Sequence, residues 1–405
     1  MEIYLVGGAV RDQLLGRNVQ DRDWVVVGAT VAQMLQQGFL QVGKDFPVFL
    51  HPTTREEYAL ARTERKSGTG YYGFTCNADP SVTLEEDLQR RDLTINALAQ
   101  DQNGNIIDPF GGQKDLQLKV LRHVSAAFAE DPVRILRIAR FAARFATLGF
   151  TIAPETMQLM RQMVADGEVD SLVPERVWQE MLCALNEASP EVFFTTLRDC
   201  GALARIFPQL DCLWGIPQKP EYHPEIDTGV HIMMALQQAV KLSSKPEVRF
   251  AVLCHDLGKG ITPKDQLPSH HGHEELGVAL IQQWCNQYRV PNNFKDLAIK
   301  VARWHLHAHR VAELRAETIV KLLQGLDAFR NPTILEDYLL ACQADSTGRA
   351  GKQNNAYPNA AILRAAFSAA CNIDVPELMS RGLEGAQLGV AILQARINAV
   401  KNINK

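Results

Sequence analysis

The sequence predicts an α+β region at the N-terminus followed by a long all-α region. Over residues 1 to about 110, short β-branched or apolar runs alternate with brief helical segments. From about residue 112 onward the apolar residues recur almost entirely at helical spacing. The chain has 405 residues, which is more than one hydrophobic core usually serves. We therefore expect several domains, of which the mixed one comes first.

Paired glycines separate the first expected strand from the first expected helix. Residues 3–6 form an apolar run that stops at Gly7 and Gly8, and residues 10–15 then fit one or two helical turns closed by Gly16. Backbone N–H groups at such a turn can approach phosphate oxygens closely. Further short strands are expected at residues 39–42, 47–50, 58–61 and 105–107. The opening of the chain thus predicts a phosphate-holding turn.

Two carboxylates follow this turn at the start of a second expected strand. Asp21 and Asp23 are separated by one residue, so in a strand both side chains project from the same face. Two carboxylates on one face can hold a pair of Mg²⁺ ions that supports phosphoryl transfer. The alternative is a glycine hairpin beside two solvated aspartates, because Gly-Gly and Asp-x-Asp are each common.

Two helix starts are marked by capping residues. Thr83 and Glu86 have the spacing of a capping box, which predicts a helix that runs through Arg91 and Asn96. Asp131, followed by proline, predicts the N-cap of a long helix that ends near residue 148. One side of that helix is apolar. Its opposite arc carries an arginine stripe: Arg134, Arg137, Arg140 and Arg144. A solvated face is the usual explanation of such a stripe, and here the neighbouring motifs favour a binding role.

The second half of the chain contains two interruptions. Residues 207–224 contain four prolines and Trp214, and they separate the first helical region from a second one that begins near Glu225. Residues 349–359 predict an exposed loop before a final helical tail.

Composition excludes several classes of protein. Hydrophobic residues make up 46% of the chain and charged residues 22%, which is ordinary for a globular protein, and no apolar run is long enough to span a bilayer. The N-terminus lacks the pattern of a secretory signal, and the eight cysteines include no Cys-x-x-Cys pair. The net charge of −4 argues weakly against wholesale nucleic-acid binding. We expect a cytoplasmic protein with reduced thiols and no membrane insertion.

Four motifs occur in order over residues 1 to about 145. They are Gly-Gly-x-Val-Arg-Asp from Gly7, Asp-x-Asp from Asp21, Arg-Arg-Asp-Leu-Thr-Ile-Asn from Arg90, and Glu-Asp-Pro-Val-Arg from Glu130. Together they resemble the class II tRNA nucleotidyltransferases, which are CCA-adding enzymes, and the related bacterial poly(A) polymerases. The resemblance implies a head domain of the polymerase β nucleotidyltransferase type, with tRNA, CTP and ATP as partners.

The same resemblance implies roles at the phosphates of the nucleotide. Asp21 and Asp23 would bind Mg²⁺, while Gly8 and Arg11 would hold the triphosphate. In this chemistry the 3′-hydroxyl of an RNA attacks the α-phosphate and pyrophosphate leaves.

Further residues would contact the rest of the nucleotide. The resemblance assigns nucleotide contacts to Arg91, Arg137 and Arg140. It places Asp92 and Asn96 on the ribose side.

Asp131 and Arg134 suggest how one protein site could choose between bases. Cytosine and adenine share an edge with an exocyclic amine donor beside a ring-nitrogen acceptor, whereas guanine and uracil present a ring N–H beside a carbonyl. A carboxylate and a guanidinium match the shared edge of C and A, and they would be left unpaired against G and U. The alternative is that Asp131 is only a helix cap and Arg134 only a surface cation.

A second chemistry is indicated by an adjacent His255-Asp256 pair at the end of an apolar helix. The pair resembles the HD superfamily of metal-dependent phosphohydrolases. That pattern adds an upstream His and a downstream Asp, which His231 and Asp345 match. Imidazole and carboxylate ligands suit transition divalent ions such as Ni²⁺, Mn²⁺ or Co²⁺. The alternative is a buried, hydrogen-bonded pair in a helical scaffold.

Additional histidines lie where some HD proteins place ligands for a second metal. They are His270, His271, His273, His305 and His307. For any one of them a surface or core position is the commoner explanation, and His273 and His305 are the best candidates.

An HD domain after a class II head is the arrangement of gammaproteobacterial CCA-adding proteins, and the resemblance extends over the whole chain. It implies a nucleotidyltransferase head (1–140), a helical, RNA-binding neck and body (141–224), an HD domain (225–346) and a helical tail (347–405). It also implies 2′,3′-cyclic phosphodiesterase, 2′-nucleotidase and phosphatase activities beside CCA addition. The chain is expected to be a monomer or a homodimer.

Three other functions share part of this pattern. A poly(A) polymerase shares the head motifs, but the HD module and the lack of a strongly basic C-terminus argue against it. Enzymes that make and hydrolyse alarmones place the HD domain first, whereas this chain places it second. A non-catalytic RNA-binding protein would not need both the paired aspartates and the His-Asp pair.

Overall fold

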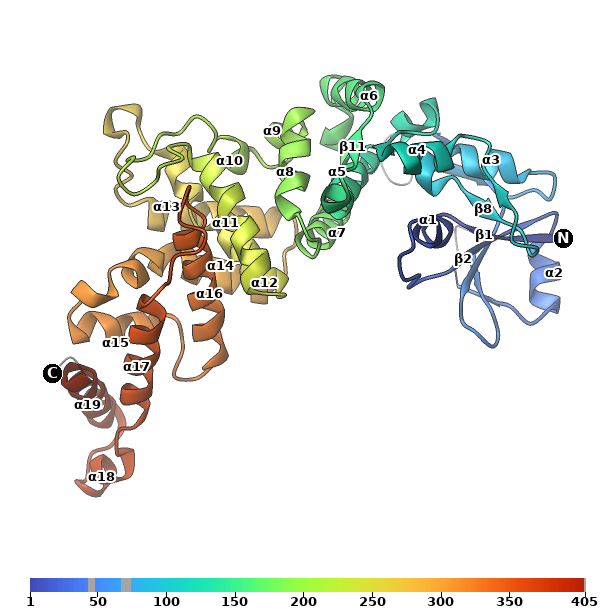
Figure 1. Cartoon of the computed structure of the whole chain (residues 1–405). Coiled ribbons are helices and arrows are strands. Elements are labelled where there is room, and N and C mark those ends of the chain that lie inside the picture. The colour runs from blue at the N-terminus through green and yellow to red at the C-terminus, as the bar shows by residue number, and fades with distance from the viewer. Residues whose placement is uncertain (43–47, 67–73, 404–405) are drawn as a thin grey trace. The chain divides into compact units, whose positions relative to one another are not determined.

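The structure is a computed structural model that describes residues 1–42, 48–66 and 74–403. It divides into two compact units, Met1–Ile206 and Phe207–Lys405 (Figure 1). Strands and helices mix in the first unit, and the named elements of the second unit are helices. This confirms the predicted order, an α+β region followed by an all-α region.

A mixed seven-stranded sheet lies in the first unit, in the order β3-β4-β5-β2-β1-β8-β9. Its strands are β1 (Glu2–Val6), β2 (Asp23–Val27), β3 (Leu40–Gln41), β4 (Val48–Leu50), β5 (Glu57–Leu60), β8 (Ala99–Gln100) and β9 (Ile106–Ile107). The expected short strands are therefore confirmed, although Pro47 lies outside the described residues. The register places Val6 opposite Asp23 and Asp23 beside Glu57. The glycine turn after β1 and the start of β2 thus share one end of the sheet.

Both faces of this sheet are buried. Neighbouring residues of a strand point to opposite faces. Accordingly, Val25 packs with Val6 and Leu88 in one apolar cluster, whereas Val26 packs with Met34 in another. A strand buried on both sides is apolar throughout, which explains the unbroken valine run of β2.

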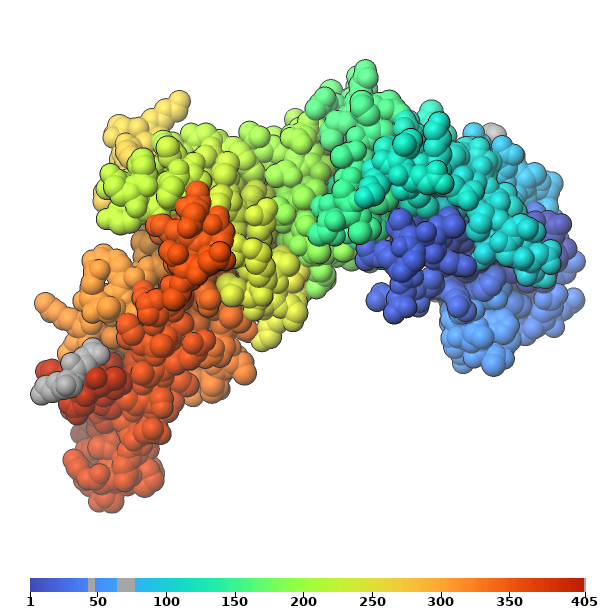
Figure 2. Space-filling view, in the orientation of Figure 1, coloured from blue at the N-terminus to red at the C-terminus, as the bar shows by residue number. Residues whose placement is uncertain are grey.

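Helices and two small strand pairs complete the first unit. The helices are α1 (Gly8–Leu14), α2 (Val31–Gln36), α3 (Leu84–Gln89), α4 (Gly112–Leu118), α5 (Val133–Phe145), α6 (Pro154–Ala165), α7 (Pro174–Leu185), α8 (Pro190–Asp199) and α9 (Ala202–Ile206). The small pairs are β6 (Thr63–Lys66) with β7 (Phe74–Asn77), and β10 (Val120–Leu121) with β11 (Thr151–Ile152). The apolar side of α5 packs against α7 and α8. In the space-filling view, the dark blue segment around α1 lies against teal and green segments of the same unit (Figure 2).

The helix predicted from Thr83 is shorter than expected. Its capping box with Glu86 is confirmed, but α3 ends at Gln89, so the prediction that it runs through Arg91 and Asn96 is wrong. The reason is a long-range contact: Leu93 forms an isolated β-bridge with His123 and is fully buried. The backbone must extend to reach this partner, and Asn96 then ends a separate 3₁₀ turn.

The second unit is a helical assembly. Its helices are α10 (Pro208–Asp211), α11 (Thr228–Leu242), α12 (Pro246–Cys254), α13 (His273–Gln287), α14 (Asn292–His309), α15 (Ala316–Gly325), α16 (Thr333–Thr347), α17 (Asn359–Cys371), α18 (Val375–Ser380) and α19 (Gly385–Ile403). α12 packs against α11, α14 and α16. The gap between α16 and α17 confirms the loop expected there. None of the described helices combines the length and apolar character that a bilayer-spanning segment requires.

Candidate active sites

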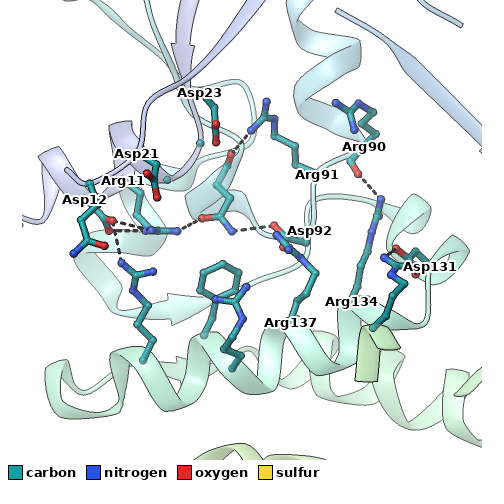
Figure 3. A pocket seen from close by; sticks show the side chains of 18 of the residues that line it. Arg11, Asp12, Asp21, Asp23, Arg90, Arg91, Asp92, Asp131, Arg134 and Arg137 are labelled. Atoms are coloured by element: carbon teal, nitrogen blue, oxygen red, sulfur yellow. Dashed lines mark hydrogen bonds and ion pairs between the residues drawn. The ribbon is translucent and has the colours of Figure 1, made fainter. Parts of the chain in front are cut away.

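A cavity of about 600 Å³ in the first unit collects the residues predicted for nucleotide chemistry (Figure 3). The predicted residues that line it are Gly8, Arg11, Asp21, Asp23, Arg91, Asp92, Asn96, Asp131, Arg134, Arg137 and Arg140. They come from the turn after β1, the start of β2, the segment after α3, and α5 with the residues that precede it. The fold therefore brings together four motifs that are far apart in the sequence.

The two carboxylates lie on one side of this cavity. Asp23 is the first residue of β2, whereas Asp21 lies in the preceding loop, so the prediction that Asp21 belongs to the strand is wrong. The strand begins at Asp23 because its partner β1 ends opposite, at Val6. Both carboxylates nevertheless face the cavity from the side opposite the α5 arginines (Figure 3).

The environment of Asp23 favours a bound cation. Desolvation in the cavity raises the pKa of Asp23, and the negative charge of Asp21 raises it further, although Arg91 opposes this shift. Carboxylate oxygens are the ligands that hard divalent cations prefer, and such an ion relieves the repulsion between two carboxylates. The donor set at Asp21 and Asp23 therefore fits Mg²⁺.

Gly7 makes room for an arginine at the cavity wall. Its φ is +67°, and a Cβ at this position would lie 2.7 Å from Nη1 of Arg91. The same Nη1 donates to the carbonyl of Asn96 at 3.4 Å, and Nη2 pairs with buried Asp87 at 3.2 Å. The positive φ favours glycine at this position, and the absence of a Cβ leaves room for the Arg91 guanidinium.

A continuous chain of hydrogen bonds crosses the cavity. Arg11 Nη1 donates to Asn96 Oδ1 at 2.6 Å, Asn96 Nδ2 donates to Asp92 Oδ1 at 2.9 Å, and Arg137 Nε donates to Asp92 Oδ2 at 2.8 Å. Burial alone would raise the pKa of Asp92, but the Arg137 guanidinium and the Asn96 amide outweigh it and hold that pKa well below its usual range. Asp92 is thus a buried anion that orients donors from α1 and α5.

The arginine stripe of α5 is engaged with protein groups, so the solvated-face alternative is wrong. Arg140 Nε donates to Glu180 Oε2 at 2.6 Å, and Arg144 pairs with Asp12 at 3.2 Å. Arg134 is 9% exposed and donates to the carbonyls of Ala127 and Arg90 at 2.8 and 2.6 Å.

Asp131 has the capping role predicted for it. Its Oδ1 accepts from the Val133 amide at 3.1 Å at the start of α5. Its Oδ2 accepts from Arg176 Nη2 at 2.9 Å. Sequence reasoning missed Arg176 and also Glu180, which lie one turn apart on α7. Their i,i+4 spacing on an amphipathic helix was the available signal.

A second cluster forms in the other unit from the residues predicted for metal chemistry. His231 on α11, His255 and Asp256 at the end of α12, and Asp345 on α16 are all buried. His255 Nε2 lies 3.1 Å from Asp256 Oδ2, and His231 Nε2 lies 3.1 Å from Asp345 Oδ1. The structure therefore places the four predicted residues together.

His273 and His305 belong to the same cluster. Their Nε2 atoms lie 3.3 and 3.6 Å from Asp256 Oδ1. With Asp256 they form one of several overlapping groups of possible ligands, in which the ligand atoms lie within 4.8 Å of one another. Of the other histidines, His270 uses its ring for Thr262 and a backbone carbonyl, His307 packs against Trp304, and His271 is exposed.

The orientation of the rings fits a metal ion. Nδ1 of His255, His273 and His305 each lies within hydrogen-bond distance of a backbone carbonyl, at 2.7, 2.7 and 3.0 Å. A carbonyl only accepts, so Nδ1 carries a proton, and in the neutral imidazole Nε2 then presents a lone pair. Nε2 of His255, Nε2 of His273 and Oδ1 of Asp256 are buried without a hydrogen-bond partner. The possible ligand atoms of the cluster lie within 4.8 Å of one another in overlapping groups, which fits the donor set of a divalent cation site.

Three polar residues beside this cluster were missed by sequence reasoning. Lys259 Nζ donates to Asp256 Oδ2 at 2.6 Å, His309 Nε2 lies 2.6 Å from Asp345 Oδ2, and Glu225 Oε1 lies 3.0 Å from His231 Nδ1. The position of His309, four residues after His305 on α14, was a usable signal. No local pattern marks Glu225, which lies in a loop before α11.

Three family models match the chain. The poly A polymerase head domain matches residues 3–122, and the HD domain matches residues 228–346. Between them, a family described as the probable RNA and SrmB-binding site of polymerase A matches residues 149–213.

Solved structures share the fold. One described as "The structure of CCA-adding enzyme apo form II" aligns with a TM-score of 0.67 and 19% identity, covering 99% of this chain and 88% of that one. Another, "Thermotoga maritima CCA-adding enzyme complexed with tRNA_CCA", aligns with a TM-score of 0.64 and 19% identity, covering 99% and 87%. At these identities the likeness concerns the fold.

Curated relatives are much closer in sequence. A "Multifunctional CCA protein" of Thioalkalivibrio sulfidiphilus is 61% identical over 403 residues, which is 100% of this chain and 98% of the relative. A protein of the same name from Vibrio campbellii is 56% identical over 401 residues, 99% of each chain. Identity at this level along the entire chain shows that it belongs to the multifunctional CCA protein family.

Proposed function

We propose that the first unit adds C, C and A to the 3′ end of tRNA from CTP and ATP without a nucleic-acid template. The observation that carries this proposal is the single cavity in which two carboxylates face the arginines of α5. Relatives named for CCA support the same reaction.

Asp21 and Asp23 would hold Mg²⁺, which supplies charge neutralisation at the triphosphate and lowers the pKa of the attacking hydroxyl. The chain's own residues then position the nucleotide. Gly8 and Arg11 would hold the triphosphate at the turn after β1. Asp92, kept ionised, orients Arg137 and Asn96 toward the rest of the nucleotide.

Base selection would fall to Asp131 and Arg134. The Arg176 guanidinium holds the Asp131 carboxylate in place. A carboxylate offers about four acceptor sites, so Asp131 retains the capacity to accept from the exocyclic amine of C or A. Arg134 would donate to the adjacent ring nitrogen, in line with its position on the cavity wall.

The cluster around His255 and Asp256 would act as a phosphohydrolase. His231, Asp345, His273 and His305 complete a ligand set that suits Ni²⁺, Mn²⁺ or Co²⁺, and such an ion supplies an activated water and polarises a phosphoryl oxygen. The substrates proposed are 2′,3′-cyclic phosphates, 2′-nucleotides and phosphate monoesters. The four-part division at residues 140, 224 and 346, and the choice between monomer and homodimer, remain proposals.

One experiment tests the main reaction. The protein is incubated with Mg²⁺ and a tRNA that lacks its terminal CCA, with CTP, ATP, GTP and UTP supplied singly and together, and the 3′ ends are sequenced. Ordered addition of C, C and A is the expected result. Long A tails would favour the poly(A) polymerase alternative, for which the matching head-domain model is the specific observation.

A further inference from the structure

A cavity of about 650 Å³ opens beside the histidine–aspartate cluster, and we infer that it binds the phosphate of a ribonucleotide through the side-chain amide of Gln218. This inference rests on the proposed phosphohydrolase function of the cluster. Lys259, His273 and His309 line the cavity together with Gln218, so a molecule bound there would lie next to the metal ligands.

Lys259 determines which way the Gln218 amide points. Its Nζ donates both to Asp256 Oδ2 and to Gln218 Oε1, each at 2.6 Å. An ammonium group has donors and no acceptor, so the reversed amide would place donor against donor. The oxygen of Gln218 is therefore held by Lys259, and the NH₂ group is directed elsewhere.

That NH₂ group has no partner in the protein. Gln218 is 3% exposed, and its Nε2 is a buried donor without a hydrogen bond. The backbone of Gln218 is also fixed, because its backbone N–H donates to the Ile226 carbonyl at 2.7 Å. A buried donor left unpaired is destabilising. A rigidly held, unpaired donor on a cavity wall points to an acceptor on a ligand.

The charge of the cavity lining indicates an anion. Four basic residues line it, Lys219, Lys259, Arg310 and Arg349, against one acidic residue, Glu313. Arg310 pairs with Glu313 at 3.0 Å, Lys259 with Asp256 at 2.6 Å and Arg349 with Asp345 at 3.3 Å, so the further positive charge of the lining comes from Lys219. Nε of Arg349 is a second buried donor without a partner. Two such donors on the lining of one basic cavity match the several oxygens of a phosphate group.

The size and walls of the cavity suit a nucleoside rather than inorganic phosphate alone. Its volume lies within the range of small-molecule sites, about 300–1,000 Å³. Tyr222, Pro268 and Leu306 form apolar parts of the lining. Tyr222 is 62% exposed and offers an aromatic face on which a base can stack. The structure thus assigns a phosphate contact at Gln218 and a base contact near Tyr222.

Two substitutions of Gln218 separate binding from a structural role. Gln218→Glu keeps the shape and the acceptor for Lys259, but it replaces the NH₂ donor with an oxygen that repels phosphate. Gln218→Leu removes both groups. Gln266→Leu, at an exposed position outside the cavity lining, is the matched control.

Binding of adenosine 2′-monophosphate is measured by calorimetry on the full-length, chelator-treated protein, and KM and kcat are measured on the metal-loaded protein. For Gln218→Glu we expect Kd and KM to rise about tenfold or more, as for a lost hydrogen bond to a charged group, with an unchanged melting temperature. If Gln218 only supports Lys259, Gln218→Glu will keep the Kd and KM of the wild type, and only Gln218→Leu will show raised values. That result overturns the inference. A wild-type protein that hydrolyses the nucleotide but does not bind it without metal also overturns it.

The failure of this inference differs from the failure of the proposed function. If the wild type hydrolyses no phosphate ester with Ni²⁺, Mn²⁺ or Co²⁺, the proposed function is wrong. If hydrolysis is normal and the KM of Gln218→Glu is unchanged, only the Gln218 contact is wrong. For Gln218→Glu the same rise in KM is expected with an oligoribonucleotide that ends in a 2′-phosphate, because the phosphate is common to both substrates. A rise in KM that is confined to the oligonucleotide would contradict a phosphate contact.

Discussion

Arg137 Nε lies 2.8 Å from Oδ2 of Asp92, a residue 45 positions earlier in the chain. The pair joins the segment after α3 to the middle of α5, and Asp92 Oδ1 simultaneously accepts from the Asn96 amide. Asp92 is 6% exposed, so its buried charge aligns the donors around the cavity that we propose for the nucleotide.

The first prediction concerns Asp92→Asn. Removing the carboxylate charge weakens the bond to Arg137, and a charge-assisted hydrogen bond contributes about 1.5–3 kcal/mol, so the free energy of unfolding of the first unit should fall by that order near neutral pH. The pKa of Asp92 is lowered in the folded protein, so its contribution is present above the unfolded-state pKa of about 3.9 and disappears as the pH falls further. The difference between wild type and variant should therefore begin to shrink below about pH 4 and be lost only as the pH falls through the lowered pKa of Asp92 in the folded protein.

Thermal or urea unfolding across this pH range provides the measurement. Asp199→Asn, at an exposed position in the same unit, is the control and should match the wild type throughout. A difference between wild type and Asp92→Asn that stays constant down to the lowest pH would show that the charge of Asp92 is not the cause.

The second prediction concerns the metal carboxylates. Asp21→Ala and Asp23→Ala should each abolish incorporation of both C and A, because the proposed mechanism uses one cavity for every step. Phosphohydrolase activity should persist, since its ligands lie in the other unit. Glu85→Ala, which removes an exposed carboxylate from α3, should leave CCA addition unchanged. Loss of only one of the two nucleotides in a primer-extension assay would contradict a single site.

Local patterns predicted much of this structure. The strand before Gly7, the capping box at Thr83 and the cap at Asp131 depend on nearby residues, and all three are confirmed. The end of α3 was not predictable in this way, because it depends on the pairing of Leu93 with His123, thirty positions along the chain.

The same distinction applies to the two sites. The motif residues were predicted, whereas their supporting partners were not. Arg144 pairs with Asp12, which lies 132 positions earlier in the sequence, and Arg176 pairs with Asp131, which lies 45 positions earlier. Such pairs arise when separate elements pack, and no periodicity in one segment reports them. Glu225, which contacts His231 from a loop, was missed for the same reason.

The third prediction concerns base selection at Asp131. Asp131→Asn keeps an oxygen that can cap α5 but adds an NH₂ donor, which matches the carbonyl of U or G. UTP and GTP incorporation should therefore rise relative to CTP and ATP. Asp131→Ala should lower the rate of nucleotide incorporation and the selectivity together, because each charged hydrogen bond that is lost contributes about 1.5–3 kcal/mol. Competition assays with all four nucleotides measure both effects. If Asp131→Asn remained as strict as the wild type, the base would have to be read by other groups.

The fourth prediction separates the two chemistries through His255 and Asp256. His255→Ala or Asp256→Ala removes a ligand from the buried cluster, so hydrolysis of 2′,3′-cyclic phosphates and 2′-nucleotides should collapse. After chelation, add-back of Ni²⁺, Mn²⁺ or Co²⁺ should restore hydrolysis by the wild type and not by the variants, because affinity depends on the number of ligands as well as on the metal. CCA addition with Mg²⁺ should be nearly unchanged, since Asp21 and Asp23 remain.

The competing explanation is that His255 and Asp256 only stabilise the helical scaffold. Both are 1% exposed, so substitution leaves a cavity and unpaired groups whatever their function. His255→Asn retains a polar side chain of intermediate size and serves as the milder variant. Melting temperature, hydrolysis and CCA addition are measured on one preparation of each variant. A loss of hydrolysis that far exceeds the change in melting temperature supports a second active site, whereas a parallel decline of all three refutes it.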